Sequence, residues 1–185
     1  PEVSLINLLD IQPLLFVNKK EYFTDYSYSL DWVHISTNNI IYLGNFDQLQ
    51  KLSRFFPKNI IINTGNNNQR QRTITINHES VDSTYTYESP VNNYDMYTRD
   101  YTIVAKVTGP KENIILYIIS FHQIGRKEIV KCLTSLEEHN KLVNSIESSL
   151  EFPDQDFIML FEVEGYRKAP YHKSLLHVVP IEASS

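Results

Sequence analysis

Short, uninterrupted apolar runs alternate with polar turns along most of the chain. Residues 40–43 form one such run, which ends at Gly44, and residues 59–63 contain a second. Runs of this kind are typical of strands that are buried on both faces. Between them, apolar positions spaced by three, three and four predict a helix that Pro57 ends: Phe46, Leu49, Leu52 and Phe56. The order strand, helix, strand predicts a right-handed βαβ unit.

Residues 66–99 have a different character. The segment opens with Asn and Gln and then alternates Thr with Ile over residues 73–76 and Thr with Tyr over residues 84–87. A period of two is typical of short strands with one exposed face. Because long unstructured loops are uncommon in compact domains, we expect a β-hairpin insertion that leaves the main sheet. The segment is either this extra hairpin or a functional loop.

Residues 101–108 and 113–121 form two strong strand patterns joined by a short turn, which predicts an antiparallel hairpin. The second of these runs is apolar on both faces, so we expect it near the centre of the sheet. Two helices follow, because apolar residues recur at helical spacing in two consecutive sets: Ile129, Cys132, Leu133 and Leu136, then Leu142, Val143, Ile146 and Leu150.

The chain closes with predicted strands at residues 156–164 and 174–181, separated by a loop at 165–173. These elements together predict an α/β fold, a three-layer sandwich around a mixed sheet of Rossmann-like or flavodoxin-like type. The antiparallel later strands make the sheet mixed rather than wholly parallel. We expect residues 1–185 to form a single domain.

Composition narrows the function classes. The chain has 185 residues, which is enough for one full hydrophobic core. A single Cys excludes an intrachain disulfide and favours a reducing, cytoplasmic location. No apolar stretch reaches the ~18 residues that a membrane span needs. A net charge of −5 argues against nucleic acid as a partner. Because the chain begins at Pro1 rather than Met, we expect a piece of a longer protein with an upstream domain.

Three segments resemble a known group of proteins. They read NIIYLGNFDQLQKLSRFF, DYTIVAKVTGPKENIILYIISFHQIGRKEIVKCLTS and FIMLFEVEGYRKAPYHKSLLHVVPI. Over residues 38–182 the chain resembles a loosely defined bacterial α/β domain that follows helical, DNA-binding or other signalling modules in multidomain regulators. That resemblance implies a regulatory role without an assigned activity or cofactor. Where many relatives carry a small-residue turn, this chain has Ser120, Phe121, His122 and Gln123.

Two strand-to-helix junctions are the candidate ligand site. In open α/β sheets a ligand binds beyond the strand ends, where helix N-termini offer N–H groups to anions. Neither junction has a glycine-rich dinucleotide or triphosphate fingerprint, so a small anionic metabolite is the expected ligand. Asn45 and Asp47 are alternatively plain helix caps. The candidate ligand-binding residues are Gly44, Asn45, Asp47, Ser120, His122, Gln123, Gly125 and Arg126.

Catalytic and metal sites have little support in the sequence. Ser120 and His122 share a strand face, yet no nucleophile elbow surrounds the serine. The six His residues show no metal-ligand spacing, and no cofactor is expected. Cys132 falls among apolar helix positions and is interpreted as a buried structural residue. The basic, aromatic residues 166–173 are interpreted as a solvated loop or a protein contact.

The favoured function is a non-enzymatic regulatory or ligand-sensing domain of a cytoplasmic bacterial signalling protein, acting as a homodimer. A first alternative is an enzyme or a metabolite-binding fold that uses the strand-end crevice, with His122 as its main polar group. A second alternative is a structural module in which the Tyr-rich hairpin mediates self-association. No catalytic residue is assigned under the favoured function.

Overall fold

The computed structural model describes residues 23–64, 71–78, 83–90, 97–152, 154–167 and 169–181. Within these ranges the larger sheet has five strands in the order β1-β6-β5-β7-β8. β1 is parallel to β6, and the other neighbouring pairs are antiparallel. The predicted hairpin of residues 101–108 and 113–121 is confirmed by the pairing of β5 with β6. The strands are β1 (Ile40–Asn45), β5 (Tyr97–Thr108), β6 (Ile114–Ser120), β7 (Phe157–Tyr166) and β8 (Ala169–Pro180).

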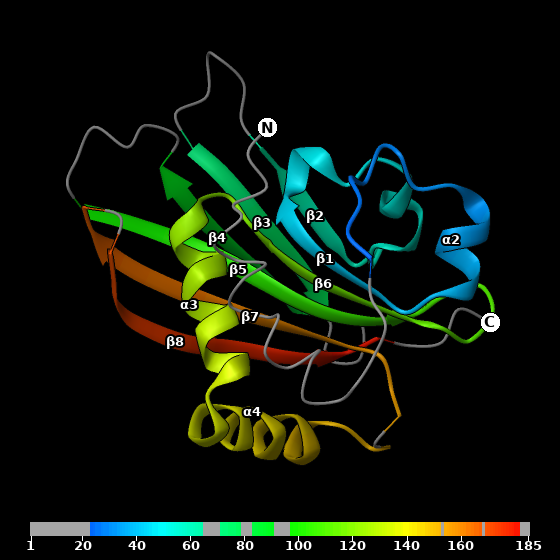
Figure 1. Ribbon diagram of the computed structural model, residues 1–185. Helices are drawn as coiled ribbons and strands as arrows, with labels where there is room; N and C mark the ends of the chain where they lie inside the picture. The colour runs from blue at the N-terminus through cyan, green and yellow to red at the C-terminus, as the bar shows by residue number, and fades with distance from the viewer. Residues whose placement is uncertain are drawn as a thin grey trace.

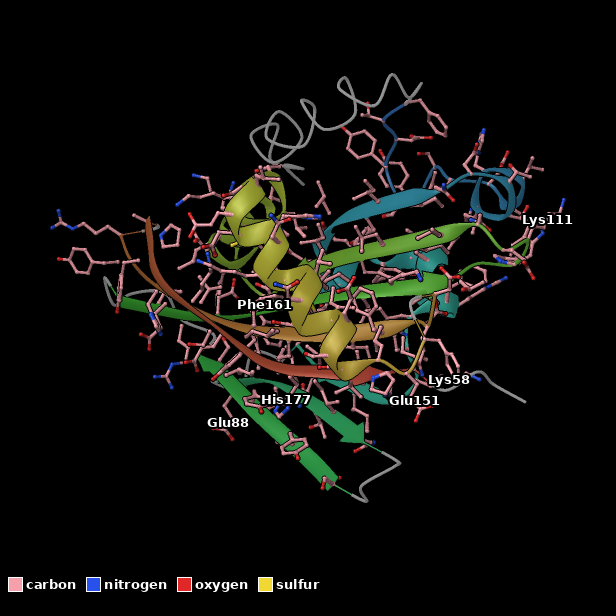
Figure 2. The ribbon with its side chains drawn as sticks, turned by 90° about the horizontal axis from the view of Figure 1, so that it is seen from below. Lys58, Glu88, Lys111, Glu151, Phe161 and His177 are labelled. Atoms are coloured by element: carbon pink, nitrogen blue, oxygen red, sulfur yellow. The ribbon has the colours of Figure 1, made fainter. Side chains whose placement is uncertain are left out.

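β5 is the central strand, and consecutive residues Ile103, Val104 and Ala105 are all buried. Successive side chains of a strand point to opposite faces, so both faces of this sheet are covered. Helices α3 (Gln123–Thr134) and α4 (Leu136–Ser149) cover one face, and Figure 1 shows them together on that side. Beneath α3 lies Phe161, which is labelled in Figure 2 and packs with Ile129 of the helix.

The other face carries a second sheet, together with short helical segments. It has three antiparallel strands in the order β2-β3-β4, which are β2 (Ile60–Asn63), β3 (Gln71–His78) and β4 (Ser83–Pro90). Ile74 and Ile76 of β3 point into the larger of the two cores together with Ile103 of β5. The short helix α2 (Trp32–Thr37) and two 3₁₀ segments complete this part of the molecule (Figure 1).

The predicted helix over residues 46–56 is instead a pair of 3₁₀ segments, η1 (Phe46–Gln48) and η2 (Gln50–Phe55). A spacing of three places side chains on one face of a 3₁₀ helix, so Phe46, Leu49 and Leu52 are all buried. The apolar pattern was therefore correct about burial and wrong about helix type. Gln50, with φ of 49°, lies where the two segments meet.

The three-layer α/β sandwich is wrong. The long helices α3 and α4 cover one face of the five-stranded sheet, whereas a second sheet forms most of the layer on the other face. Strand residues outnumber helical ones in the described ranges. The βαβ unit is wrong as well, because β1 pairs with β6 while β2 pairs with β3 in the other sheet. A short apolar run predicts a strand without naming its neighbour, and Ile61 of β2 is in fact 57% exposed.

Two further expectations change. β3 and β4 do pair as a hairpin, but their inner face is core rather than an excursion from the main sheet. The predicted loop at residues 165–173 is largely strand, because β7 and β8 stay paired as far as Tyr166 and Ala169. Arg167, with φ of 50°, lies in the turn between these two strands. None of the helices in the described part of the chain is long and apolar enough to cross a membrane.

Candidate functional site

The two predicted junctions meet in space. β1 and β6 are parallel neighbours, and their last residues, Asn45 and Ser120, are register partners. Parallel strands end at the same edge of a sheet, so the segments that follow them start side by side. α3 begins at Gln123, directly after this edge. The structure thus brings most of the predicted site residues to one place.

Arg126 is the centre of the cluster. Its side chain is on α3, only 8% of the residue is exposed, and burial lowers the pKa of the guanidinium. Arg126 Nη1 donates to the carbonyl oxygen of Gly44 at 3.1 Å, to Oδ1 of Asn45, and to Oγ of Ser120 at 3.1 Å. One guanidinium therefore holds the ends of both parallel strands to the first turn of the helix.

Asp100 of β5 completes the cluster, although it was not among the predicted site residues. Its carboxylate accepts from the backbone N–H of His122 at 3.2 Å and from that of Gly125 at 3.0 Å. These are N–H groups at the start of α3, where an anionic ligand was expected. The residue is fully buried, which raises the pKa of the carboxyl to about 7 against the opposing effects of these N–H groups and of Arg126.

A signal for Asp100 existed in the sequence. If the strand pattern of residues 101–108 is extended by one residue, side chains at 100, 102 and 104 lie on one face. Val104 belongs to the core on the helix side. A carboxylate at position 100, on the same buried face, needs hydrogen-bond donors or a charged partner to offset the cost of burial. The sequence could thus have marked Asp100 as a buried polar group, although it could not have named His122 and Gly125 as its partners.

The Ser120 hydroxyl both donates and accepts a hydrogen bond. It donates to the carbonyl oxygen of His122 and accepts from Arg126. Asn45 does occupy the N-cap position of η1, but its side chain makes no cap hydrogen bond and its Oδ1 accepts from Arg126 instead. Asp47 in η1 and Gln123 at the start of α3 are both exposed, outside the buried cluster.

The two glycines of the site have structural reasons of their own. A Cβ at Gly44 would lie within 2.5 Å of the Tyr42 ring, which folds back so that its hydroxyl donates to the carbonyl oxygen of Asn45 at 3.0 Å. A Cβ at Gly125 would lie within 2.5 Å of Asp100 Oδ2 and would also overlap the hydroxyl of Thr102. Close packing within the protein explains both glycines without a ligand.

A second polar row joins the two sheets on the opposite face. The Tyr87 hydroxyl of β4 is hydrogen-bonded to His177 Nε2 of β8, and the Tyr87 ring lies 5.4 Å from that of Tyr101. Tyr101 in turn donates to Glu162 Oε2 at 2.9 Å, and burial together with this carboxylate raises the pKa of Tyr101 to about 12. Arg99 lies 3.5 Å from the same oxygen. The row comes from four strands, so no local motif predicted it.

Cys132 and the charges near it belong to the helix layer. The prediction that Cys132 is buried is confirmed. Lys173 of β8 bridges the two helices, because it pairs with Glu128 of α3 at 3.4 Å and with Glu138 of α4 at 2.7 Å. Over the described ranges, His, Cys, Asp and Glu form no group of three that could hold a metal ion.

Comparison with known proteins adds no relative. The chain matches no protein-family model, and neither the curated proteins nor the solved structures gave a match. The resemblance to a bacterial regulatory domain accordingly stays a prediction from residues 38–182.

Proposed function

We propose that this protein is a non-enzymatic regulatory domain that acts by binding. We also propose that its strand-end junction is a structural latch, meaning a set of hydrogen bonds that holds α3 on the sheet. One observation carries the proposal: the polar groups of the junction are bonded to one another. Asp100 accepts from the first N–H groups of α3, and Arg126 donates to the ends of β1 and β6. Groups that an active site or an anion site would offer to a ligand instead hold the helix on the sheet.

One feature favours a second candidate, a site for a small anionic metabolite. Within the described residues all the hydrogen-bond acceptors of Arg126 are neutral oxygens, and the Asp100 carboxyl acts on the guanidinium only electrostatically. Arg72 of β3 adds a second guanidinium near the end of β6, where Nη1 donates to the carbonyl oxygen of Phe121 at 3.3 Å. Two guanidinium groups at one edge of a sheet would attract an anion.

A thermal-shift screen distinguishes these two candidates. The purified chain is tested with inorganic phosphate, sulfate, citrate, sugar phosphates and nucleotides. A ligand at 100 times its Kd adds about 2.7 kcal/mol of stability. The latch predicts no saturable rise in Tm with any of these anions. A saturable rise that is lost in Asn45→Ala would overturn the latch and support the metabolite site.

The same variant tests the latch without a ligand. Asn45→Ala removes an acceptor from the buried Arg126, so we expect a loss of about 1 to 3 kcal/mol in the free energy of unfolding. The matched control is Asn144→Ala on the exposed side of α4, which should stay within about 0.5 kcal/mol of the parent. Equal stability of the two variants would contradict the latch.

A further inference from the structure

The outer edge of β4 differs from the other strand edges in the described part of the chain. β4 pairs with β3 through eight consecutive positions without a register shift, and no described strand pairs with its other side. An unpaired edge presents backbone N–H and C=O groups that another strand can bind. Figure 2 shows β3 and β4 at the lower margin of the molecule, with Glu88 labelled on β4.

The remaining edges carry features that block such pairing. β8 contains Pro170, Lys173 and Pro180, and its ladder with β7 has two register shifts. β1 has the carbonyl oxygens of its last two residues bonded to Arg126 and to Tyr42, while β2 has only four residues. Prolines, charges and bulges are the usual protections of an edge strand. β4 carries Glu88 and ends at Pro90, but residues 84–87 contain no proline, charge or bulge.

The edge is also held rigid from within. Tyr85 and Tyr87 lie on the inner face of β4, with ring centroids 4.3 Å and 5.7 Å from the His177 ring of β8. Figure 2 shows His177 close to the strand that bears Glu88. A strand that is already fixed in extended form loses little further entropy when it pairs. The outer face presents Thr84, Thr86 and Glu88, all exposed.

We propose that the outer edge of β4 pairs with β4 of a second copy of this chain, antiparallel about a two-fold axis at Thr86. This axis places the two Thr86 side chains opposite each other, Thr84 opposite Glu88, and Tyr85 opposite Tyr87. Hydroxyl faces carboxylate and ring faces ring, which are favourable cross-strand pairs, and no two charges of the same sign are opposed. The two three-stranded sheets become one continuous sheet of six strands.

This inference goes beyond the proposed function. The pairing of β4 and the strand-end latch can each fail without the other, because the anion screen does not depend on self-association. The test is the mass of the chain by light scattering over a dilution series. The parent should rise from 21.6 kDa towards twice that mass as concentration increases. A mass that stays at 21.6 kDa throughout would overturn the proposal.

Charge variants test the register. Thr86→Lys opposes two like charges at the axis, so this variant should stay monomeric, and so should Thr86→Glu. The matched control is Thr75→Lys on β3, the register partner of Thr86 on the same outer face but not on the edge, which should associate like the parent. Circular dichroism melting checks that each variant is folded.

A mixture of the Thr86→Lys and Thr86→Glu variants places opposite charges across the axis and should recover the mass of the pair. Association that persists unchanged in Thr86→Lys, or that is lost equally in Thr75→Lys, would overturn the proposed interface. Failure of the mixture to recover association would overturn the Thr86 register.

Discussion

Asp100 shows how one buried carboxyl can determine the chemistry of a site. The start of a helix favours a negative charge, and in many α/β proteins a ligand provides it. Here the Asp100 side chain reaches across from β5 and provides it instead. Arg126 on α3 lowers the pKa of Asp100, and Asp100 in turn raises the pKa of Arg126. Neither effect offsets burial, so the pKa of Asp100 still lies near 7.

The raised pKa predicts a pH dependence of stability. The folded state keeps the Asp100 proton up to about pH 7, whereas the unfolded chain releases it near 3.8. Between these values the folded state binds more protons, so the free energy of unfolding should fall as pH rises, by on the order of 1 to 4 kcal/mol. Urea denaturation at pH 5 and pH 8 measures this fall.

Asp100→Asn is the matched test, because the amide oxygen still accepts from the N–H groups but does not titrate. Thr102 Oγ1, a buried atom with no hydrogen-bond partner in the described ranges, offers an acceptor for the new NH₂ group. The variant should show a flatter pH profile than the parent between pH 5 and 8. An equally steep profile would assign the pH dependence to another group.

At the level of the elements, the close approach of α3 to β5 depends on Gly125, which has no side chain. Gly125 lies in the first turn of α3, where its N–H reaches Asp100 and its Cα faces Thr102. In the sequence this glycine was a candidate ligand residue, because it lies at a strand-to-helix junction. A strand of the same protein occupies that space, so the glycine serves helix-to-sheet packing.

Gly125→Ala should therefore reverse the usual effect of this substitution. In an exposed helix the change stabilises by about 1 kcal/mol. At Gly125 the added Cβ collides with Asp100 and Thr102, so we expect a loss of about 1 to 3 kcal/mol. Chemical denaturation measures it, with Asn140→Ala at an exposed position of α4 as the control. A Gly125→Ala variant at least as stable as the parent would contradict the close approach.

At the scale of the whole molecule, the second sheet is a structural layer rather than a decoration. Its inner residues share a core with β5, β6 and β7, and the row from Tyr87 to Glu162 joins the two sheets. Layers of this kind bury one face each and must form together. Removing core volume from β3 should accordingly destabilise the entire protein.

Ile74→Ala is expected to cost about 2 to 5 kcal/mol in the free energy of unfolding, because Ile74 is completely buried between the sheets. Ile61→Ala on the outer face of β2 is the control and should stay within about 0.5 kcal/mol of the parent. Thermal melting followed by near-UV circular dichroism compares the two. A loss confined to a local transition, with the main sheet intact, would show that the second sheet is an independent hairpin.

Local sequence pattern was sufficient to predict most of the strands and the two long helices. Its apolar runs placed β1, β5, β6, β7 and β8, its helical spacing placed α3 and α4, and its strand ends identified Asn45, Ser120 and Arg126. These features follow from local periodicity and turn chemistry, which act over a few residues. The same information also predicted the buried state of Cys132.

Strand pairing and the partners of the buried polar groups depend on contacts between distant parts of the chain. β1 and β2 are both short apolar runs. β1 nevertheless pairs with β6, about seventy residues further along the chain, whereas β2 belongs to the other sheet. The partners of Asp100 and Arg126 come from segments far apart in sequence. Distant segments compete to pair over the same buried surface. The local pattern therefore predicts that a strand forms, whereas its neighbour in the sheet depends on how the whole chain packs.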